Sequence, residues 1–254
     1  MTMPIDTVGR FTDRVENYVR YRPGYPAGVI GLFRDKMSLT PDDIVADIGS
    51  GTGISARQFV ENGNIVFGVE PNDAMRAAAE EYLKEFLRFR SVNGTSTATT
   101  LGDRSVDIIV AAQAFHWFEP EGTKMEFERI IKPGGYVALI WNERQLDSTP
   151  FLRGYEQLLL KYATDYQKVR HENVTQAALN GFLGDGFERE TFDNVQVLDL
   201  AQLTGRLLSS SYTPADSDER YQPMIDELGS LFAKHAENGR IKVFYDTNVF
   251  YTRY

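Results

Sequence analysis

Glycines at alternate positions follow a short apolar run, Val45-Ala46-Asp47-Ile48, as Gly49-Ser50-Gly51-Thr52-Gly53. At the carboxyl end of a parallel strand, such glycines let the backbone pass close to a ligand. The N-terminus of the helix that follows presents free N–H groups to an anionic part of that ligand, such as a carboxylate or a phosphate. Asp47 suits an ammonium group. The alternative is a glycine-rich turn that holds no ligand.

A carboxylate, Glu70, ends the next apolar run in Phe67-Gly68-Val69-Glu70-Pro71-Asn72. In nucleotide-binding sheets an acidic side chain at this place accepts both ribose hydroxyls. A solvated carboxylate at a strand end is the alternative. A dinucleotide fingerprint would need its third glycine at position 54, which is Ile54. The spacing therefore disfavours a nucleotide-dependent oxidoreductase, which we keep as an alternative.

Polar residues also follow the run Val106–Ala112, in Gln113-Ala114-Phe115-His116-Trp117-Phe118. The carboxyl ends of neighbouring parallel strands face one crevice, so Gln113 and His116 are expected beside the glycine loop. Because the unperturbed pKa of histidine lies near neutrality, His116 could act as a general base. It could equally be a structural histidine between its two aromatic neighbours.

Taken together, these three segments resemble the class I S-adenosylmethionine-dependent methyltransferases, whose first motif is an acidic residue followed by Gly-x-Gly-x-Gly. The resemblance implies a Rossmann-like, doubly wound α/β fold with seven mostly parallel strands, the last of them, 241–254, inserted antiparallel. It also implies S-adenosylmethionine as cofactor and in-line transfer of its methyl group to a small-molecule acceptor, with His116 as the catalytic candidate on the acceptor side. The expected cofactor-binding residues are Tyr18, Arg22, Asp47, Gly49, Ser50, Gly51, Gly53, Glu70, Pro71, Met75, Ser96, Thr97 and Gln113.

The arm at 18–26 and the loop after the third expected strand need separate comment. The arm Tyr18-Val19-Arg20-Tyr21-Arg22-Pro23-Gly24-Tyr25-Pro26 resembles the start of a subset that includes trans-aconitate methyltransferase-like proteins, and its aromatic faces could attract the cofactor's sulfonium. A strut that packs on the core is the alternative. In the loop after the third strand, related chains more often have Ala-Glu where this one has Ser96-Thr97. Arg20, Arg22 and Arg206 are candidate clamps for an acceptor carboxylate.

These residues need a scaffold, and the chain alternates short apolar runs with amphipathic stretches, as a parallel sheet with crossover helices does. Strands are expected at 44–48, 65–70, 87–92, 106–112, 136–141, within 187–200 and at 241–254. Helices are expected at 11–20, 27–36, 55–61, 73–85, 121–131, 149–183, 201–211 and 220–237. Without a linker or repeat, we expect a single domain over 1–254, made of an arm (1–39), a cofactor-binding core (40–141) and acceptor-side elements (142–254).

Composition narrows the classes of function. The 254 residues have a net charge of −9 with no basic stripe, which disfavours nucleic-acid binding, and no apolar run approaches the ~20 residues of a membrane span. The chain has no cysteine, three histidines and no secretory signal pattern, so we expect a cytoplasmic protein without a metal site. A non-catalytic cofactor-binding or regulatory protein is the other alternative, and the acceptor and oligomeric state stay open.

Overall fold

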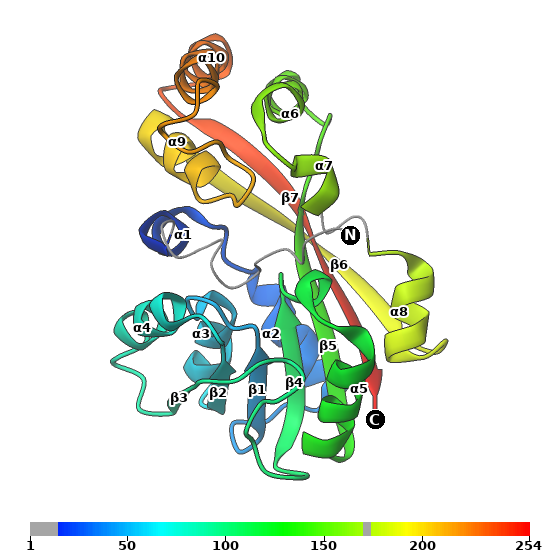
Figure 1. The fold of residues 1–254 in the computed structure, drawn as a ribbon. Coiled ribbons are helices and arrows are strands. Elements are labelled where there is room, and N and C mark those ends of the chain that lie inside the picture. Colours follow the sequence, from blue (N-terminus) through cyan, green and yellow to red (C-terminus); the bar gives the residue numbers. More distant parts are fainter. Residues whose placement is uncertain (1–14, 170–173) are drawn as a thin grey trace, which may run out of the picture.

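A computed structural model describes residues 15–169 and 174–254. Its centre is a seven-stranded sheet in the order β3-β2-β1-β4-β5-β7-β6 (Figure 1). The strands are β1 (Ile44–Ile48), β2 (Ile65–Val69), β3 (Phe89–Val92), β4 (Val106–Ala112), β5 (Ile131–Arg144), β6 (Glu188–Leu198) and β7 (Ile241–Arg253).

Strands β1 to β5 pair in parallel, and β7 lies antiparallel between β5 and β6. The expected fold class, a Rossmann-like doubly wound sheet with an inserted antiparallel last strand, is confirmed. In such a sheet the order reverses where β1 and β4 lie side by side, and the crevice beyond their carboxyl ends is the usual ligand site. The glycine loop after β1 begins at that crevice.

Helices cover both faces of the sheet, because each face of a parallel sheet is apolar and must be buried. On one face α2 (Ala27–Met37), α3 (Ile54–Glu61) and the end of α4 (Asp73–Tyr82) pack through Phe33, Phe59 and Leu83. On the other face α5 (Pro120–Ile130) and α8 (Gln176–Leu183) pack through Phe127 and Phe182.

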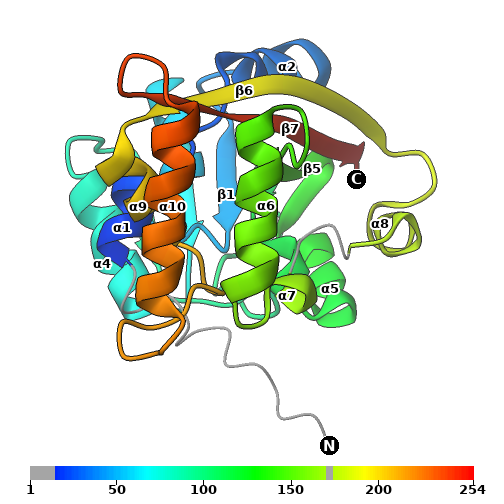
Figure 2. The same cartoon turned by 90° about the horizontal axis from the view of Figure 1, so that it is seen from above.

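A third apolar cluster lies beyond the carboxyl ends of the parallel strands, where β6 and β7 extend past the rest of the sheet (Figures 1 and 2). It joins α6 (Pro150–Tyr162), α7 (Tyr166–Val169), α9 (Leu200–Leu208) and α10 (Tyr221–His235). Helix α1 (Val15–Tyr21) packs on α9 and α4 at the same end of the sheet. Of these helices, α1, α7 and α9 contribute residues that line the crevice, namely Tyr18, Tyr166 and Arg206.

Most expected elements have the observed type, with shifted ends. Residues 11–14 of the first expected helix lie outside the described residues, and 149–183 is three helices, with 170–173 also undescribed. The largest difference is β5, which begins at Ile131 and continues past Trp141 to Arg144, because Asn142, Glu143 and Arg144 pair with Thr247, Asp246 and Tyr245 of β7. No helix of the described residues is long and apolar enough to cross a bilayer.

Candidate active site

The glycine loop lies at the end of β1 with its backbone in the left-handed region. Gly49 has a φ of +69° and Gly51 one of +53°. A Cβ on Gly49 would lie 2.6 Å from the Cβ of Ala114, so this glycine lets the loops after β1 and β4 approach each other. A Cβ on Gly51 would meet nothing within 4 Å. The loop therefore leaves a backbone-lined space that a ligand could fill.

Glu70 fastens this loop to the end of β2. Its Oε2 accepts from the N–H of Gly51 over 3.1 Å, and its Oε1 accepts from the N–H of Asn72 over 2.9 Å. Burial raises the pKa of Glu70, and these backbone hydrogen bonds together with Arg76 oppose the shift. A carboxylate has about four lone-pair positions, so two of them are still available to hydroxyl donors.

The loop after β3 completes this side of the crevice through Gly94, Thr95 and Ser96. Ser96 accepts a hydrogen bond from Thr123 of α5 over 2.8 Å, and the buried Thr99 donates to Glu126 of α5 through both its N–H (2.8 Å) and its hydroxyl (2.5 Å). Helix α5 thus holds the loop in place although the residues differ from those more usual in related chains.

After β4 the chain makes a sharp turn at Gln113, a non-glycine residue with a φ of +56°. Its side-chain amide donates to the carbonyl of Asn142 over 3.1 Å. Backbone strain of this kind costs on the order of 1–3 kcal/mol and clusters at functional sites. A short 3₁₀ turn, η2 (Phe115–Trp117), follows and places His116 beside the ring of Trp117, with 4.8 Å between the ring centroids.

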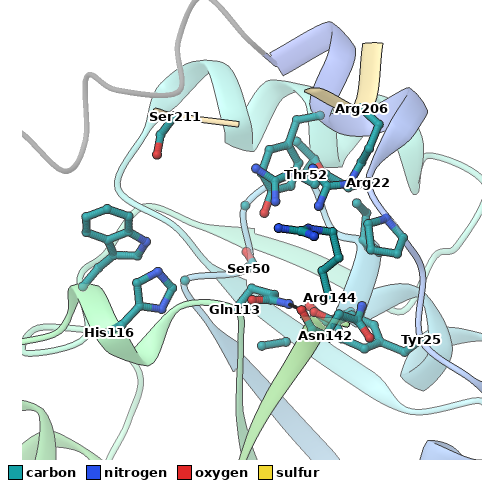
Figure 3. Close-up of a pocket in the computed structure, with 18 of the residues that line it drawn as sticks. Arg22, Tyr25, Ser50, Thr52, Gln113, His116, Asn142, Arg144, Arg206 and Ser211 are labelled. Carbon is teal, nitrogen blue, oxygen red and sulfur yellow. Dashed lines mark hydrogen bonds between the residues drawn. The ribbon is translucent and has the colours of Figure 1, made fainter. Parts of the chain in front are cut away.

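Two adjoining cavities meet at this crevice. The first, which we call the Glu70 cavity, has a partly apolar wall that includes Glu70, Pro71, Met75, Ser96 and Phe118. The second, which we call the arginine cavity, includes Ser50, His116, Arg22, Arg144 and Arg206 (Figure 3). Residues lining both are Tyr18, Gly49, Gly51, Gln113 and Trp117. One elongated ligand could therefore occupy both.

Three guanidiniums gather on one side of the arginine cavity, and His116 lies on the other (Figure 3). Arg144 pairs with the carboxylate of Glu156, with 2.5 Å between Nη2 and Oε2. Arg22 donates to the carbonyl of Ser209 over 2.9 Å and lies over the ring of Tyr18. Within the described residues, no carboxylate lies within ion-pair distance of Arg22 or Arg206.

Burial and the neighbouring guanidinium of Arg206 lower the pKa of Arg22. The usual pKa of arginine is so high that both groups stay charged at neutral pH. Arg206 is buried and Arg22 is half-buried; two cations this close without a counterion repel each other, and an anionic ligand would relieve that repulsion. The arginine cavity is thus suited to a ligand with a negative charge.

The structure brings most expected site residues to the two cavities. The residues that line one or both of them are Tyr18, Arg22, Gly49, Ser50, Gly51, Glu70, Pro71, Met75, Ser96, Gln113 and His116. Arg206 lines the arginine cavity too, whereas Arg20 is exposed and lines neither.

Asp47, Gly53 and Thr97 line neither cavity. Asp47 lies beneath the loop, where it accepts from the Ser55 hydroxyl over 2.5 Å. Burial raises its pKa to about 7, with the bond from Ser55 opposing the shift and the Glu70 carboxylate adding to it. Gly53 is the N-cap of α3, and Thr97 lies against Gly122 of α5. Their positions suit support of the loops better than contact with a ligand.

The family comparison decides the class of this site. Residues 46–139, which carry the glycine loop, Glu70 and His116, match the family model described as a methyltransferase domain. This chain is an S-adenosylmethionine-dependent methyltransferase. The identification decides against the oxidoreductase and non-catalytic alternatives, and it makes S-adenosylmethionine the cofactor.

Similar proteins cover different shares of this methyltransferase. An uncharacterized methyltransferase-like protein of Schizosaccharomyces pombe is 27% identical over 251 residues, which are 94% of this chain and 93% of that protein. An uncharacterized methyltransferase of Mycobacterium tuberculosis is 35% identical over 138 residues, which are 53% of this chain and 52% of that protein. The fold is similar to that of an Anaeromyxobacter dehalogenans protein assigned as a type II methyltransferase (TM-score 0.67, 20% identity, covering 92% of this chain and 98% of that one).

The residues of this methyltransferase fit its cofactor chemically. Buried polar atoms with no hydrogen-bond partner among the described residues include Oγ1 of Thr52 and Nε of Arg22. Thr52 and Arg22 line the arginine cavity, and Gly51, where a Cβ would meet open space, lines both cavities. Met75 and Phe118 give the Glu70 cavity apolar surface for a flat ring.

Several lining residues were not expected from the sequence, notably Asn142 and Arg144. Both follow Trp141, where the apolar run ends, and the pattern of polar residues at the carboxyl end of a buried strand could have identified them. Tyr166 and Tyr212 lie within 142–254, which was expected on the acceptor side, although nothing in its sequence named a ligand.

Proposed function

We propose that this methyltransferase acts on a small molecule that carries a carboxylate, and that Arg22 and Arg206 bind that group. The observation that carries the proposal is the pair of guanidiniums, the buried Arg206 and the half-buried Arg22, that have no carboxylate partner in the described residues and line a cavity that includes the glycine loop. Arginine forms paired, charge-assisted hydrogen bonds to carboxylates. The resemblance of the arm to trans-aconitate methyltransferase-like proteins supports the same acceptor chemistry.

The cofactor would extend across both cavities. We propose that Glu70 accepts its ribose hydroxyls, that Met75, Pro71 and the 94–96 backbone contact its adenine, and that Gly49, Ser50 and Gly51 lie along it. Tyr18 and Gln113, which line both cavities, would lie near its methionine part. When bound, S-adenosylmethionine supplies a methyl group on a sulfonium sulfur, which is a good leaving group because it departs as the neutral thioether of S-adenosylhomocysteine.

The chain's own task is then alignment. Arg22 and Arg206 fix the acceptor on one side, and the strained turn at Gln113 holds the wall that the two cavities share, so that the acceptor atom is held in line with the methyl group. A carboxylate acceptor is already deprotonated at neutral pH and needs no base. In that case His116 positions the acceptor; a hydroxyl, amine or carbon acid would instead require His116 to remove a proton.

An acceptor screen tests the proposal. The purified enzyme would be supplied with S-adenosylmethionine and with a panel of small carboxylic acids beside their amides, and S-adenosylhomocysteine release would be measured. We expect turnover with an acid and none with its amide. Arg206→Met should raise the acceptor KM by at least tenfold, whereas Arg189→Met, outside both cavities, should not. Equal turnover of acids and amides would overturn the proposal.

The 1–254 segment is proposed to work as one domain, because the proposed cofactor residues come from the arm and from 40–141, and the arginines come from the arm, β5 and α9. No single one of these segments contains both the proposed cofactor residues and the three arginines. The cytoplasmic location expected from composition stays a prediction.

A further inference from the structure

Tyr245 of β7 is a buried tyrosine behind Arg206. Its ring is 1% exposed, and its hydroxyl oxygen accepts from Nε of Arg206 over 3.2 Å. The same hydroxyl donates to Oε1 of Gln196 on the neighbouring strand β6, over 2.7 Å. One phenol thus links Arg206 to the edge strand of the sheet.

The direction of these hydrogen bonds is fixed by the arm. The side-chain amide nitrogen of Gln196 donates to the backbone carbonyl of Tyr21 over 3.0 Å. A carbonyl can only accept, so the amide nitrogen must face Tyr21 and the amide oxygen must face Tyr245. The single hydroxyl proton of Tyr245 then goes to Gln196, and an oxygen lone pair is left toward Arg206. The donor and the acceptor of each of the three hydrogen bonds, from Gln196 to Tyr21, from Tyr245 to Gln196 and from Arg206 to Tyr245, are therefore fixed.

The guanidinium of Arg206 has N–H donors that are not used in these hydrogen bonds. Arg206 donates through Nε to Tyr245 and through Nη1 to Ser210, over 3.2 Å in each case. Arginine has five N–H donors, so three have no acceptor among the described residues. Arg206 lines the arginine cavity, and helix α9, which carries it, contacts α1 directly where the ring of Tyr21 lies against Gly205.

We propose that Gln196 and Tyr245 are positioning residues that set the orientation of Arg206 for the acceptor's anionic group, and that they do so only when the arm is docked on β6 and α9. The proposal rests on the proposed function, because it assumes that Arg206 binds an anion. It adds two residues outside the cavity wall and makes anion recognition depend on the Tyr21 carbonyl.

Sulfate binding to the S-adenosylhomocysteine-loaded full chain, measured by calorimetry, tests this without knowledge of the acceptor. Tyr245→Phe removes only the hydroxyl, and Gln196→Met removes only the amide from a side chain of similar length. The matched control is Tyr251→Phe, a buried tyrosine on the same strand whose hydroxyl donates to Glu188 outside the site. Arg206→Met reports on the anion site itself.

We expect Tyr245→Phe to weaken sulfate binding about tenfold, as loss of one hydrogen bond to a charged group predicts, and Gln196→Met to weaken it by a smaller factor. S-Adenosylhomocysteine affinity should be unchanged in both variants. A general structural defect would lower that affinity, so this measurement separates a positioning role from damage to the fold. Tyr251→Phe should bind sulfate as the wild type does.

The other outcomes separate the two proposals. If Arg206→Met weakens sulfate binding but Tyr245→Phe and Gln196→Met do not, the positioning role is wrong and the anion site stands. If the wild type does not bind sulfate, or Arg206→Met binds it unchanged, the anion site and the positioning role are both overturned.

Discussion

The N–H of Gly51 donates to Oε2 of Glu70 over 3.1 Å, so the glycine loop after β1 is tied to the end of β2. One carboxylate therefore has two tasks in this methyltransferase: it shapes the loop, and we propose that it also accepts the ribose hydroxyls of the cofactor. The two tasks can be separated by experiment, since one affects folding and the other affects only binding.

Glu70→Ala should lower S-adenosylmethionine affinity tenfold to a hundredfold, because charge-assisted hydrogen bonds contribute about 1.5–3 kcal/mol. Calorimetry measures the affinity, and thermal unfolding without ligand measures the contribution to the loop. The control is Glu61→Ala at the end of α3, which removes a carboxylate paired with Arg57 and outside both cavities. A folded Glu70→Ala protein with affinity within twofold of the wild type would exclude the ribose role.

Gly51→Ala should abolish measurable cofactor binding while the protein still folds. The new methyl group would enter space that is open in the structure and that we assign to the ligand. The left-handed backbone costs an alanine about 1–2 kcal/mol. Gly239→Ala is matched to it, because Gly239 also has a positive φ (+70°) and no atom near its Cβ position but lies outside both cavities. Both variants should lose similar stability, and retained binding by Gly51→Ala would place the cofactor elsewhere.

His116→Asn distinguishes a positioning residue from a base. With a carboxylate acceptor we expect a higher acceptor KM, turnover within a few-fold of the wild type, and unchanged cofactor affinity. Steady-state kinetics across pH measures all three. A loss of turnover of about 10²–10⁴-fold at saturating acceptor, with the acidic limb of the pH profile gone, would instead identify His116 as a base.

Glu126→Gln should make the fold less sensitive to acid. Burial alone would raise the pKa of Glu126, but hydrogen bonds from Arg129 and Thr99 outweigh it and lower the pKa to about 2. A carboxyl group whose pKa is lower in the folded state stabilises the fold at pH values above its pKa in the unfolded chain, which is about 4.3. For Glu126 this contribution to the free energy of unfolding is about 3 kcal/mol, and it is lost as the pH falls toward 2.

Urea unfolding at pH 6 and pH 3 measures the difference. The wild type should exceed Glu126→Gln in stability at pH 6, and the gap should narrow at pH 3. The exposed Glu128 on the same helix provides the control, Glu128→Gln, for which no gap is expected at either pH. A gap of constant size at both pH values would contradict the assignment.

The sequence predicted the elements around the glycine loop well because the signals for them are local. Strand, glycine loop and helix follow one another within a few residues, and β1 and β4 begin and end as expected. The ends of β1, β2 and β4 then come together because parallel strands share one edge of the sheet.

The acceptor side depends on contacts between distant segments, which no local pattern encodes. Arg22 reaches the carbonyl of Ser209, 187 residues away, through the docking of α1 on α9. Arg144 enters the cavity because pairing with β7 extends β5 beyond its apolar run. Asp47 was expected from its spacing to bind the cofactor; the fold places it beneath the loop, bonded to Ser55, and its role toward the cofactor stays a prediction.

Strand β7 also affects the order in which the chain can fold during synthesis. Strand β6 pairs with no described strand except β7, and β7 is the last of the described strands in chain order. While residues 241–253 are still inside the ribosome, β1 to β5 can already pair, but β6 has no neighbour. Gln196 and Tyr245 therefore meet only after β7 has emerged, so a nascent chain can pair β1 to β5 around the glycine loop before the support behind Arg206 is in place.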